Sequence, residues 1–170
     1  MTTIRPENPG DRDPIYHVHR EAFGGEAESR LVDALRESPA FIPELSLVAV
    51  DNDDVVGHIL FTRVEVEDEG ASHPALALAP MGVLPARQNL GIGSALVRRG
   101  LEEARRLEHG VVLVLGHPSY YPRFGFRPAE ALGIRSPFEA PSEAFLALEL
   151  SPGALKDVHG LVRYPPEFFQ

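Results

Sequence analysis

Cysteine is absent from all 170 residues of the chain. Its absence excludes disulfide bonds, cysteine-ligated metal sites and a cysteine nucleophile. No apolar run approaches the roughly 18 residues that a membrane-spanning helix needs. The N-terminal segment also lacks the apolar core of a signal peptide. We therefore expect a soluble, cytoplasmic protein that does not enter a membrane.

Positive charge is scarce, and the net charge of −9 argues against general nucleic-acid binding. The basic residues are nevertheless concentrated. Between residues 85 and 127 seven arginines stand against three glutamates, a local balance of +4, which leaves −13 for the rest of the chain. Such a segment could attract a small polyanion, or it could form a solvated helix face. We favour the solvated face for Arg105 and Arg106.

Apolar periodicity predicts the elements of a single α/β domain spanning residues 1–170. Helices are predicted over 11–22, 26–37 and 91–108, and strands over 3–6, 45–50, 55–66, 75–83, 111–115, 144–150 and 161–164. The polar, glycine-bearing stretch 68–74 is predicted to be a loop. Short turns between the early strands indicate an antiparallel meander. The strand, helix and apolar strand from 75 to 115 indicate one right-handed parallel crossover in a mixed, mostly antiparallel sheet.

The turn before the third helix reads Arg87-Gln88-Asn89-Leu90-Gly91-Ile92-Gly93-Ser94. Glycines at a helix start let a ligand approach the backbone, and the unpaired N–H groups and positive helix end suit a pyrophosphate. A tight turn packed against the sheet would explain the same glycines. The turn lacks the lysine of a Walker loop, and Leu96 stands where a dinucleotide loop needs a third small residue.

These residues resemble the acetyl-CoA motif of the GNAT superfamily of N-acetyltransferases. The string Gln88-x-x-Gly91-x-Gly93 follows a strand ending Met81-Gly82-Val83, and Tyr121-Pro122-Arg123-Phe124-Gly125-Phe126 matches a later family motif in order and spacing. The resemblance covers a core of about residues 3–127, with a C-terminal extension over 128–170. It implies a GNAT-like fold with helices on both faces of a central sheet. The whole pattern is similar to a bacterial subgroup of predicted acetyltransferases.

The resemblance implies that acetyl-CoA enters between strands 76–83 and 111–115. Its pantetheine arm would pair with the first strand, and its pyrophosphate would bind the glycine turn. The cofactor-binding residues implied in this way are Met81, Gly82, Val83, Gln88, Asn89, Leu90, Gly91, Ile92, Gly93, Ser94 and Phe124. No metal is expected, because three histidines at ligand spacing do not occur.

Transfer of an acetyl group to a primary amine by direct attack needs a neutral amine, donors for the oxyanion and a proton for the departing thiolate. The resemblance places Tyr121 beside the cofactor sulfur as that proton donor; packing under the turn at 124–126 is the other interpretation. Strand 75–83 contains no acid, where many family members carry a glutamate, so the general base is unassigned. His117 is the first candidate, although a loop-positioning role is equally compatible. His58 is expected to be a hydrogen-bonded sheet residue and His19 a surface residue.

Phe23 and Glu26 are expected to line the acceptor side. The acceptor would be a small-molecule amine or a protein amine. The acidic remainder of the chain is compatible with a cationic acceptor, but acidity is also common for solubility, so charge alone does not choose. Polyamines, aminoglycosides, lysine side chains and protein N-termini all remain open. The protein is expected to be a monomer or a homodimer. The alternative hypothesis is an acetyl-CoA-binding module or sensor without efficient catalysis; a nucleotide-dependent oxidoreductase is a third.

Overall fold

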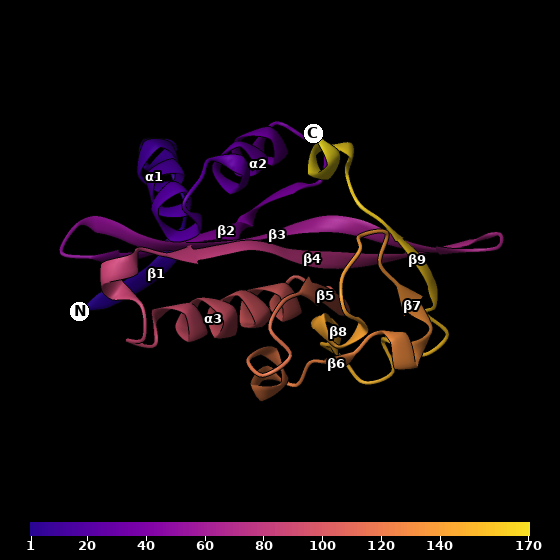
Figure 1. Cartoon of the computed structure of the whole chain (residues 1–170). Helices are drawn as coiled ribbons and strands as arrows, with labels where there is room; N and C mark the ends of the chain where they lie inside the picture. The colour runs from indigo at the N-terminus through magenta and orange to yellow at the C-terminus, as the bar shows by residue number, and fades with distance from the viewer.

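The computed structural model describes all 170 residues, which build one nine-stranded sheet with helices on both faces (Figure 1). The sheet order is β1-β2-β3-β4-β5-β8-β6, and β9 pairs with β3 and β7. The elements are β1 (Thr2–Pro6), α1 (Arg12–Phe23), α2 (Ala27–Arg36), β2 (Phe41–Asp51), β3 (Asp54–Asp68), β4 (Ala71–Val83), α3 (Ile92–Arg106), β5 (Val111–Leu115), β6 (Arg127–Pro128), β7 (Ile134–Arg135), β8 (Phe145–Glu149) and β9 (Gly160–Arg163). Three of the short 3-10 helices matter below: η2 (Pro85–Arg87), η3 (Tyr121–Phe124) and η6 (Pro166–Phe169).

Strands β1 to β4 form the predicted antiparallel meander. Helix α3 then carries the chain across to β5, which lies parallel to β4. The two-residue strand β7 is also parallel to β9, and all other pairs are antiparallel. The predicted fold class, a mixed and mostly antiparallel sheet with a parallel crossover, is therefore confirmed.

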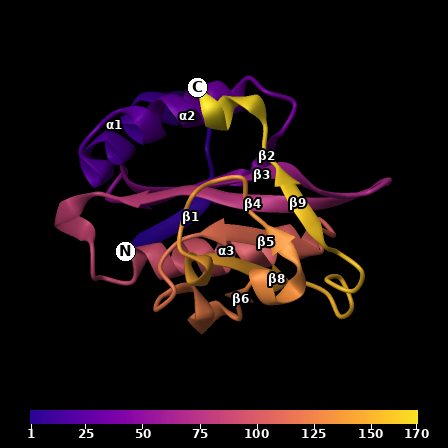
Figure 2. The same ribbon diagram turned by 45° about the vertical axis from the view of Figure 1, so that its right-hand side comes forward.

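The two faces of the sheet carry different helices. Helices α1 and α2, together with η6, lie on one face, and α3 lies on the other (Figures 1 and 2). One apolar cluster contains Ile15, Val32 and Leu60, whereas the α3 side is filled by Phe61 and its neighbours. Each such fully buried side chain contributes about 1.5–3 kcal/mol by leaving water. Alternation along the strands therefore fixes which residues meet α1 and which meet α3.

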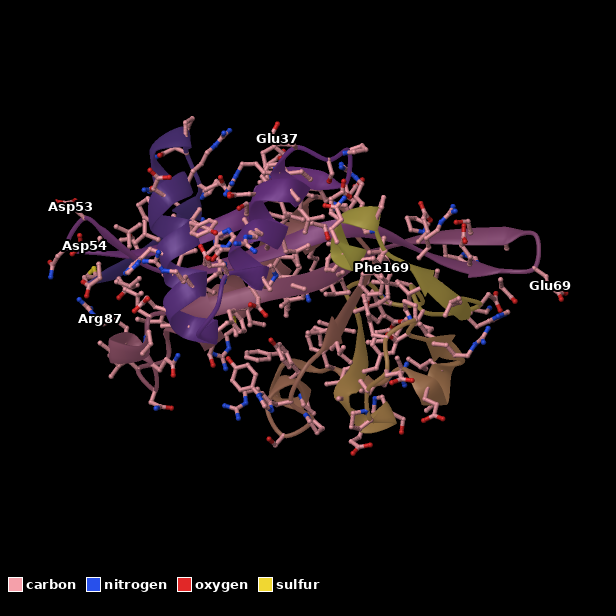
Figure 3. The ribbon with its side chains drawn as sticks, turned by 45° about the horizontal axis from the view of Figure 1, so that its top comes forward. Glu37, Asp53, Asp54, Glu69, Arg87 and Phe169 are labelled. Atoms are coloured by element: carbon pink, nitrogen blue, oxygen red, sulfur yellow. The ribbon has the colours of Figure 1, made fainter.

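The hairpin between β3 and β4 is longer than predicted. The predicted loop at 68–74 was wrong, because β4 begins at Ala71 and the turn is confined to Glu69 and Gly70. Polar side chains hid these strand ends, since the hairpin projects into solvent (Figure 3 labels Glu69 at its tip). Pairing of β9 with β3 and an ion pair of 2.7 Å between Arg163 and Glu67 support the extension.

The C-terminal extension is built into the sheet and is not an appendage. Strand β8 pairs with β5 over the whole of β5, and β9 pairs with β3. The helix η6, which follows β9, contacts α2 on the sheet face opposite α3. None of the three α-helices combines the length and the apolar character that crossing a bilayer requires.

Candidate active site

Strands β4 and β5 separate soon after they meet. They pair only at Leu76 with Val112 and at Ala77 with Leu113, and the rest of β4 has no partner on that side. A register shift in the β3–β4 pairing between Ile59 and Phe61 marks a bulge in β4 near the point of separation. A cavity of about 1100 Å³ lies there. Ligand pockets usually span about 300–1,000 Å³, so this cavity is slightly larger than the usual range.

The start of α3 presents a row of free donors to this cavity. No hydrogen bond within the protein uses the six backbone N–H groups from Asn89 to Ser94. The first backbone hydrogen bond of the helix is donated by Ala95 to the Gly91 carbonyl at 3.0 Å. Left-handed backbone at Asn89 (φ 63°) and Gly91 (φ 84°) turns the chain so that this row forms. The positive end of the helix dipole adds to the attraction of an anion.

The loop before α3 is anchored to the strands. Gln88 donates from Nε2 to the Val83 carbonyl at 3.0 Å. Arg87, at the η2 end of the molecule in Figure 3, forms an ion pair with Asp51. That arginine is the main cause that lowers the pKa of the Asp51 carboxyl. Because Asp51 already neutralises Arg87, the loop attracts an anion through its backbone groups more than through a free arginine.

The end of β4 offers backbone groups to the gap. Leu84 donates to the Val56 carbonyl at 2.9 Å, and Gly82 stands opposite His58. Hydrogen-bonded and non-hydrogen-bonded pairs alternate in antiparallel sheets, so Gly82 directs its polar groups towards β3. Met81 and Val83 direct theirs away from β3, towards the gap. Of the three strand residues predicted to bind the cofactor, these two line the cavity and Gly82 does not.

Tyr121 lies in η3, directly after β5, and lines the cavity. Its side chain is 7% exposed, and no hydrogen bond within the protein holds its hydroxyl. Burial, with a smaller contribution from Tyr120, raises the pKa of Tyr121 to about 12, so the phenol stays protonated at neutral pH. A Cβ atom at Gly116 would lie 2.4 Å from the Tyr121 ring. Only glycine at position 116 leaves room for the ring, a positional role that the sequence analysis missed.

Tyr120 connects η3 to the start of α3. Its hydroxyl lies 2.9 Å from Ser94 Oγ, in the first turn of the helix. Its ring packs edge-on against Tyr121 at 5.0 Å and Phe124 at 5.3 Å, with the Arg123 guanidinium 4.5 Å from the ring centre. Both tyrosines line the cavity. Tyr120 also links η3 to α3 through Ser94, whereas the Tyr121 hydroxyl has no partner within the protein.

The remaining predicted site residues fall into two groups. His117 and Phe23 line the cavity, and both are exposed. Phe124, Leu90 and Glu26 do not line it. Phe124 packs under Tyr120 and Arg98, and Leu90 points into solvent with 68% of its surface exposed. Glu26 accepts from the Tyr16 hydroxyl at 2.7 Å and pairs with Arg30. The acid that lines the cavity is Glu28, two residues further on.

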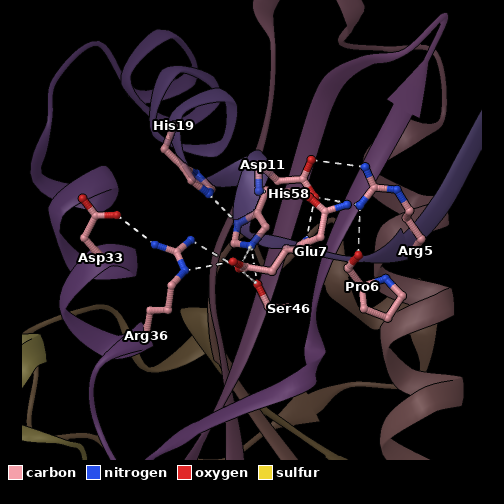
Figure 4. A network of polar contacts seen from close by, with 11 residues as sticks. Arg5, Pro6, Glu7, Asp11, His19, Asp33, Arg36, Ser46 and His58 are labelled. Atoms are coloured by element: carbon pink, nitrogen blue, oxygen red, sulfur yellow. Dashed lines mark hydrogen bonds and ion pairs between the residues drawn. The ribbon is translucent and has the colours of Figure 1, made fainter.

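A buried polar network lies between α1 and the sheet, on the α1 side of β4 (Figure 4). The prediction of a surface position for His19 was wrong: the residue is fully buried, and its Nε2 lies 2.8 Å from His58 Nδ1. His58 Nε2 lies 2.8 Å from Ser46 Oγ, and Ser46 donates to Glu7, which pairs with Arg36 at 2.9 Å. The expected hydrogen-bonded role of His58 is confirmed.

The direction of these bonds fixes the histidine tautomers. Because Ser46 donates to Glu7, it accepts from His58 Nε2, and His58 Nδ1 then accepts from His19 Nε2. His19 Nδ1 is left without a proton or a partner. It lies against Gly82, where an added Cβ would be 2.8 Å away. The network therefore consists of two neutral imidazoles, one of which packs against the α1-facing side of β4.

We predict that acid destabilises the fold through this network. Burial lowers the pKa of His19 to about 3 from 6.5. Burial raises the pKa of Glu7, but hydrogen bonds to His58, Arg36 and Ser46 outweigh it and lower that pKa to about 2. A depressed folded pKa gives stability that is present above the unfolded pKa and lost as pH falls towards the folded one. His19 alone should cost about 1.4 kcal/mol of unfolding free energy per pH unit below roughly 6.5.

Urea unfolding between pH 7 and pH 5 measures this loss. His19→Asn should flatten the slope over that range, whereas His17→Asn, on the exposed face of the same helix, should retain it. Equal slopes in wild type and His19→Asn would show that His19 does not carry the pH dependence.

The separated strands, the donor row at the start of α3 and the tyrosine facing the gap define a class of protein: an acyltransferase that takes its acyl group from a CoA thioester. The chain belongs to the GNAT family. A family model described as "Acetyltransferase (GNAT) domain" matches residues 3–129. The family and enzyme class predicted from the sequence are thus confirmed.

Known relatives agree over most of the chain. The N-acetyltransferase YjhQ of Escherichia coli K12 is 40% identical over 142 residues, covering 83% of this chain and 78% of YjhQ. The E. coli YhbS structure in complex with CoA superposes with a TM-score of 0.92 at 32% identity, covering 99% of this chain and 92% of YhbS. A GNAT acetyltransferase from Brucella melitensis in complex with acetyl-CoA gives 0.80 at 35% identity, covering 99% and 98%.

Proposed function

We propose that this protein transfers the acetyl group of acetyl-CoA to a primary amine by direct attack in a ternary complex. The observation that carries the proposal is that the donor row, through Asn89 and residues 91–94, and the buried Tyr121 line one cavity, at the point where β4 and β5 separate. Acetyl-CoA supplies the activated thioester. The residues of this chain bind and orient the two substrates, and they move protons between them.

The donor row is proposed to bind the pyrophosphate. The six free N–H groups can each donate without breaking a bond elsewhere in the protein. Gly91 and Gly93 leave the backbone accessible, since no side chain covers it. Charge-assisted hydrogen bonds of this kind are roughly twice as strong as neutral ones. The local excess of arginine adds attraction at longer range.

Val83 is proposed to stabilise the oxyanion. Its N–H points away from β3 into the gap and shares a peptide plane with the Gly82 carbonyl, which the β3 pairing directs towards His58. This pairing fixes the direction of the N–H before the substrates arrive. A preorganised donor at an oxyanion is typically worth on the order of 10²–10³ in kcat.

Tyr121 is proposed to stabilise the departing thiolate. Its pKa of about 12 lies well above the ordinary thiol value of about 8.5. Full proton transfer from Tyr121 to a solvated thiolate would therefore be uphill by about 5 kcal/mol. The phenol instead donates a hydrogen bond as the C–S bond breaks, and it transfers the proton only as the enclosed thiolate becomes more basic.

The proton balance of the reaction requires a group that accepts protons from the amine. A primary ammonium and the thioester give an amide, a thiol and one released proton. The amine must lose one proton before its lone pair attacks and a second after the C–N bond forms. His117, exposed in the cavity lining, is proposed to accept one of them, because an imidazole can take up a proton at neutral pH.

Two measurements test this function. Acetyl-CoA should raise the melting temperature of the protein, because binding to the native state stabilises it, whereas NADH should not. Release of free CoA thiol should then depend on an added amine. Stabilisation by acetyl-CoA without amine-dependent thiol release would support the binding-module alternative and contradict catalysis. Stabilisation by NADH alone would contradict the cofactor assignment.

A further inference from the structure

The cavity extends beyond the residues that the proposed mechanism uses. Away from the phosphate-binding loop it is lined by Phe138, Tyr164 and Phe168, all from the C-terminal extension. Phe168 lies in η6, which is beside α2 in Figures 1 and 2. Tyr164 follows β9, and Phe138 follows β7, the strand that pairs with β9. None of the three contributes to the pyrophosphate or thiolate sites. This part of the cavity, defined by these three side chains, is the extension end.

The extension end is aromatic. Phe138 packs edge-on against Tyr164 at 4.8 Å, and Tyr164 lies 5.0 Å from Phe168. Phe169, labelled in Figure 3, stacks on Phe138 from outside at 5.2 Å. The rings are held by one another and by the apolar cluster beneath them. Aromatic side chains provide large apolar area in fixed orientations, so a flat apolar ligand would bind here without much reordering of side chains.

Glu28 is the one acidic residue in the lining of the whole cavity. It is half-buried and takes part in no hydrogen bond or ion pair within the protein. Arg87 of the lining pairs with Asp51. Arg123 donates to the Tyr120 carbonyl and lies over the Tyr120 ring, so its charge lies beside η3 and not at the extension end. Glu28 is thus the one negative charge in the lining, and no group of the protein pairs with it.

The position of Glu28 is fixed by the local structure. It lies in the first turn of α2, where the helix dipole favours an acid. Ser29, its neighbour, donates to the Tyr16 carbonyl at 2.7 Å and so holds this turn against α1. Helix stabilisation explains why an acid is tolerated here, but any exposed position in the turn would serve that purpose. A half-buried carboxylate on the cavity wall additionally attracts a cation.

We propose, resting on the function proposed above, that the acceptor is a small primary amine with a single positive charge and an apolar, preferably aromatic, body. Glu28 binds the ammonium group, and Phe138, Tyr164 and Phe168 contact the body. A polycation would leave further ammonium groups against aromatic rings without carboxylates. An amino acid would bring a second carboxylate close to Glu28. Both classes are therefore disfavoured.

In this scheme Glu28 acts on binding and not on the chemical step. A primary amine arrives as an ammonium ion at neutral pH. The carboxylate concentrates that form in the cavity, and the proton then leaves before the nitrogen attacks the thioester carbonyl. Loss of the Glu28 charge should consequently raise KM for the amine and leave kcat nearly unchanged.

A panel of three amines tests the substrate class with the intact protein. The probes are 2-phenylethylamine, spermidine and phenylalanine, each measured by release of CoA thiol at saturating acetyl-CoA. We expect kcat/KM for 2-phenylethylamine to exceed both others by at least about tenfold, the discrimination that one hydrogen-bonded charge supplies. A preference for spermidine or phenylalanine would overturn the proposal.

The role of Glu28 has a matched control in the same segment. Glu28→Gln keeps the shape of the side chain and removes its charge; Glu26→Gln does the same outside the cavity. We expect Glu28→Gln to raise KM for 2-phenylethylamine about 10- to 100-fold with kcat unchanged, and Glu26→Gln to leave KM within about twofold. Equal effects of the two variants would overturn the assignment of Glu28.

Titration with acetyl-CoA, carried out first, separates this inference from the function on which it rests. Failure of the wild-type protein to bind acetyl-CoA overturns the proposed function itself. Binding of acetyl-CoA, with acetylation of amines other than 2-phenylethylamine, overturns only the acceptor proposal. Binding of acetyl-CoA without acetylation of any amine contradicts the catalytic function as well.

Discussion

Tyr121→Phe is expected to lower kcat about 100-fold while leaving the Kd for acetyl-CoA within about twofold, the effect of removing one positioned proton donor. The substitution removes only the hydroxyl. Because no group in the protein bonds to that hydroxyl, its loss leaves no buried partner unpaired. The ring contacts with Phe126 at 5.6 Å and with the Gly116 backbone remain. Steady-state kinetics and calorimetric titration measure the two quantities separately.

Tyr120→Phe is the control for this prediction. It breaks the bond to Ser94, so it should reduce the free energy of unfolding by about 1 kcal/mol. It should leave kcat within about threefold, because Tyr120 is not proposed to meet the thiolate. Unchanged turnover in Tyr121→Phe, or equal loss in both variants, would remove Tyr121 from the mechanism.

Gly93→Asp is expected to weaken acetyl-CoA binding about 100-fold without unfolding the protein. A Cβ at Gly93 meets Met81 Cε at 3.5 Å, an ordinary contact, so a side chain fits. An acid in the first turn of α3 also interacts favourably with the helix dipole. Its charge would nevertheless oppose a pyrophosphate charge about 5 Å away, at a cost of about 3 kcal/mol for an effective dielectric constant near 20.

Gly93→Asn separates charge from bulk. The two side chains have nearly the same size, so the ratio of their acetyl-CoA Kd values reports the charge alone. That ratio should be at least tenfold and should shrink as salt rises, because the repulsion is screened. Equal affinities of the two variants would show that no anion binds at the start of α3.

Much of the core could be predicted from local pattern. Strand 111–115 was predicted with its observed bounds, because five consecutive apolar residues leave few alternatives. The end of α3 was placed two residues late: Glu108, with φ 67°, leaves the helix before Gly110 is reached. A glutamate in left-handed backbone carries no sequence signal, whereas a glycine does.

Among the residues that line the cavity, those of the glycine turn were predicted more fully than those at the extension end. The glycine turn forms a motif with fixed spacing, so the sequence alone is enough to locate it. Glu28 and the rings of the extension come from segments more than 100 residues apart, and only tertiary packing brings Phe138 and Phe168 to the same cavity. Sequence analysis selected Glu26, since nothing local distinguishes it from Glu28.

His19 is another residue whose environment could not be predicted from the local sequence. Its spacing from Ile15 and Val18 places it on the buried face of α1, but the polarity of histidine favoured the interpretation as a surface residue. Burial is stabilised by His58, a residue 39 positions away that supplies its hydrogen bond. A buried polar pair of this kind is specified jointly by two strands and a helix, and no single segment predicts it.

Acetyl-CoA is proposed to lie between β4 and β5, with its pyrophosphate at the start of α3. A crystal structure of the protein in complex with CoA tests this placement. We predict pyrophosphate oxygens at hydrogen-bond distance, about 3 Å, from backbone N–H groups between Asn89 and Ser94, with the sulfur beside the Tyr121 hydroxyl. CoA bound elsewhere would exclude the proposed cofactor site, and a sulfur remote from Tyr121 would exclude the proposed role of that tyrosine.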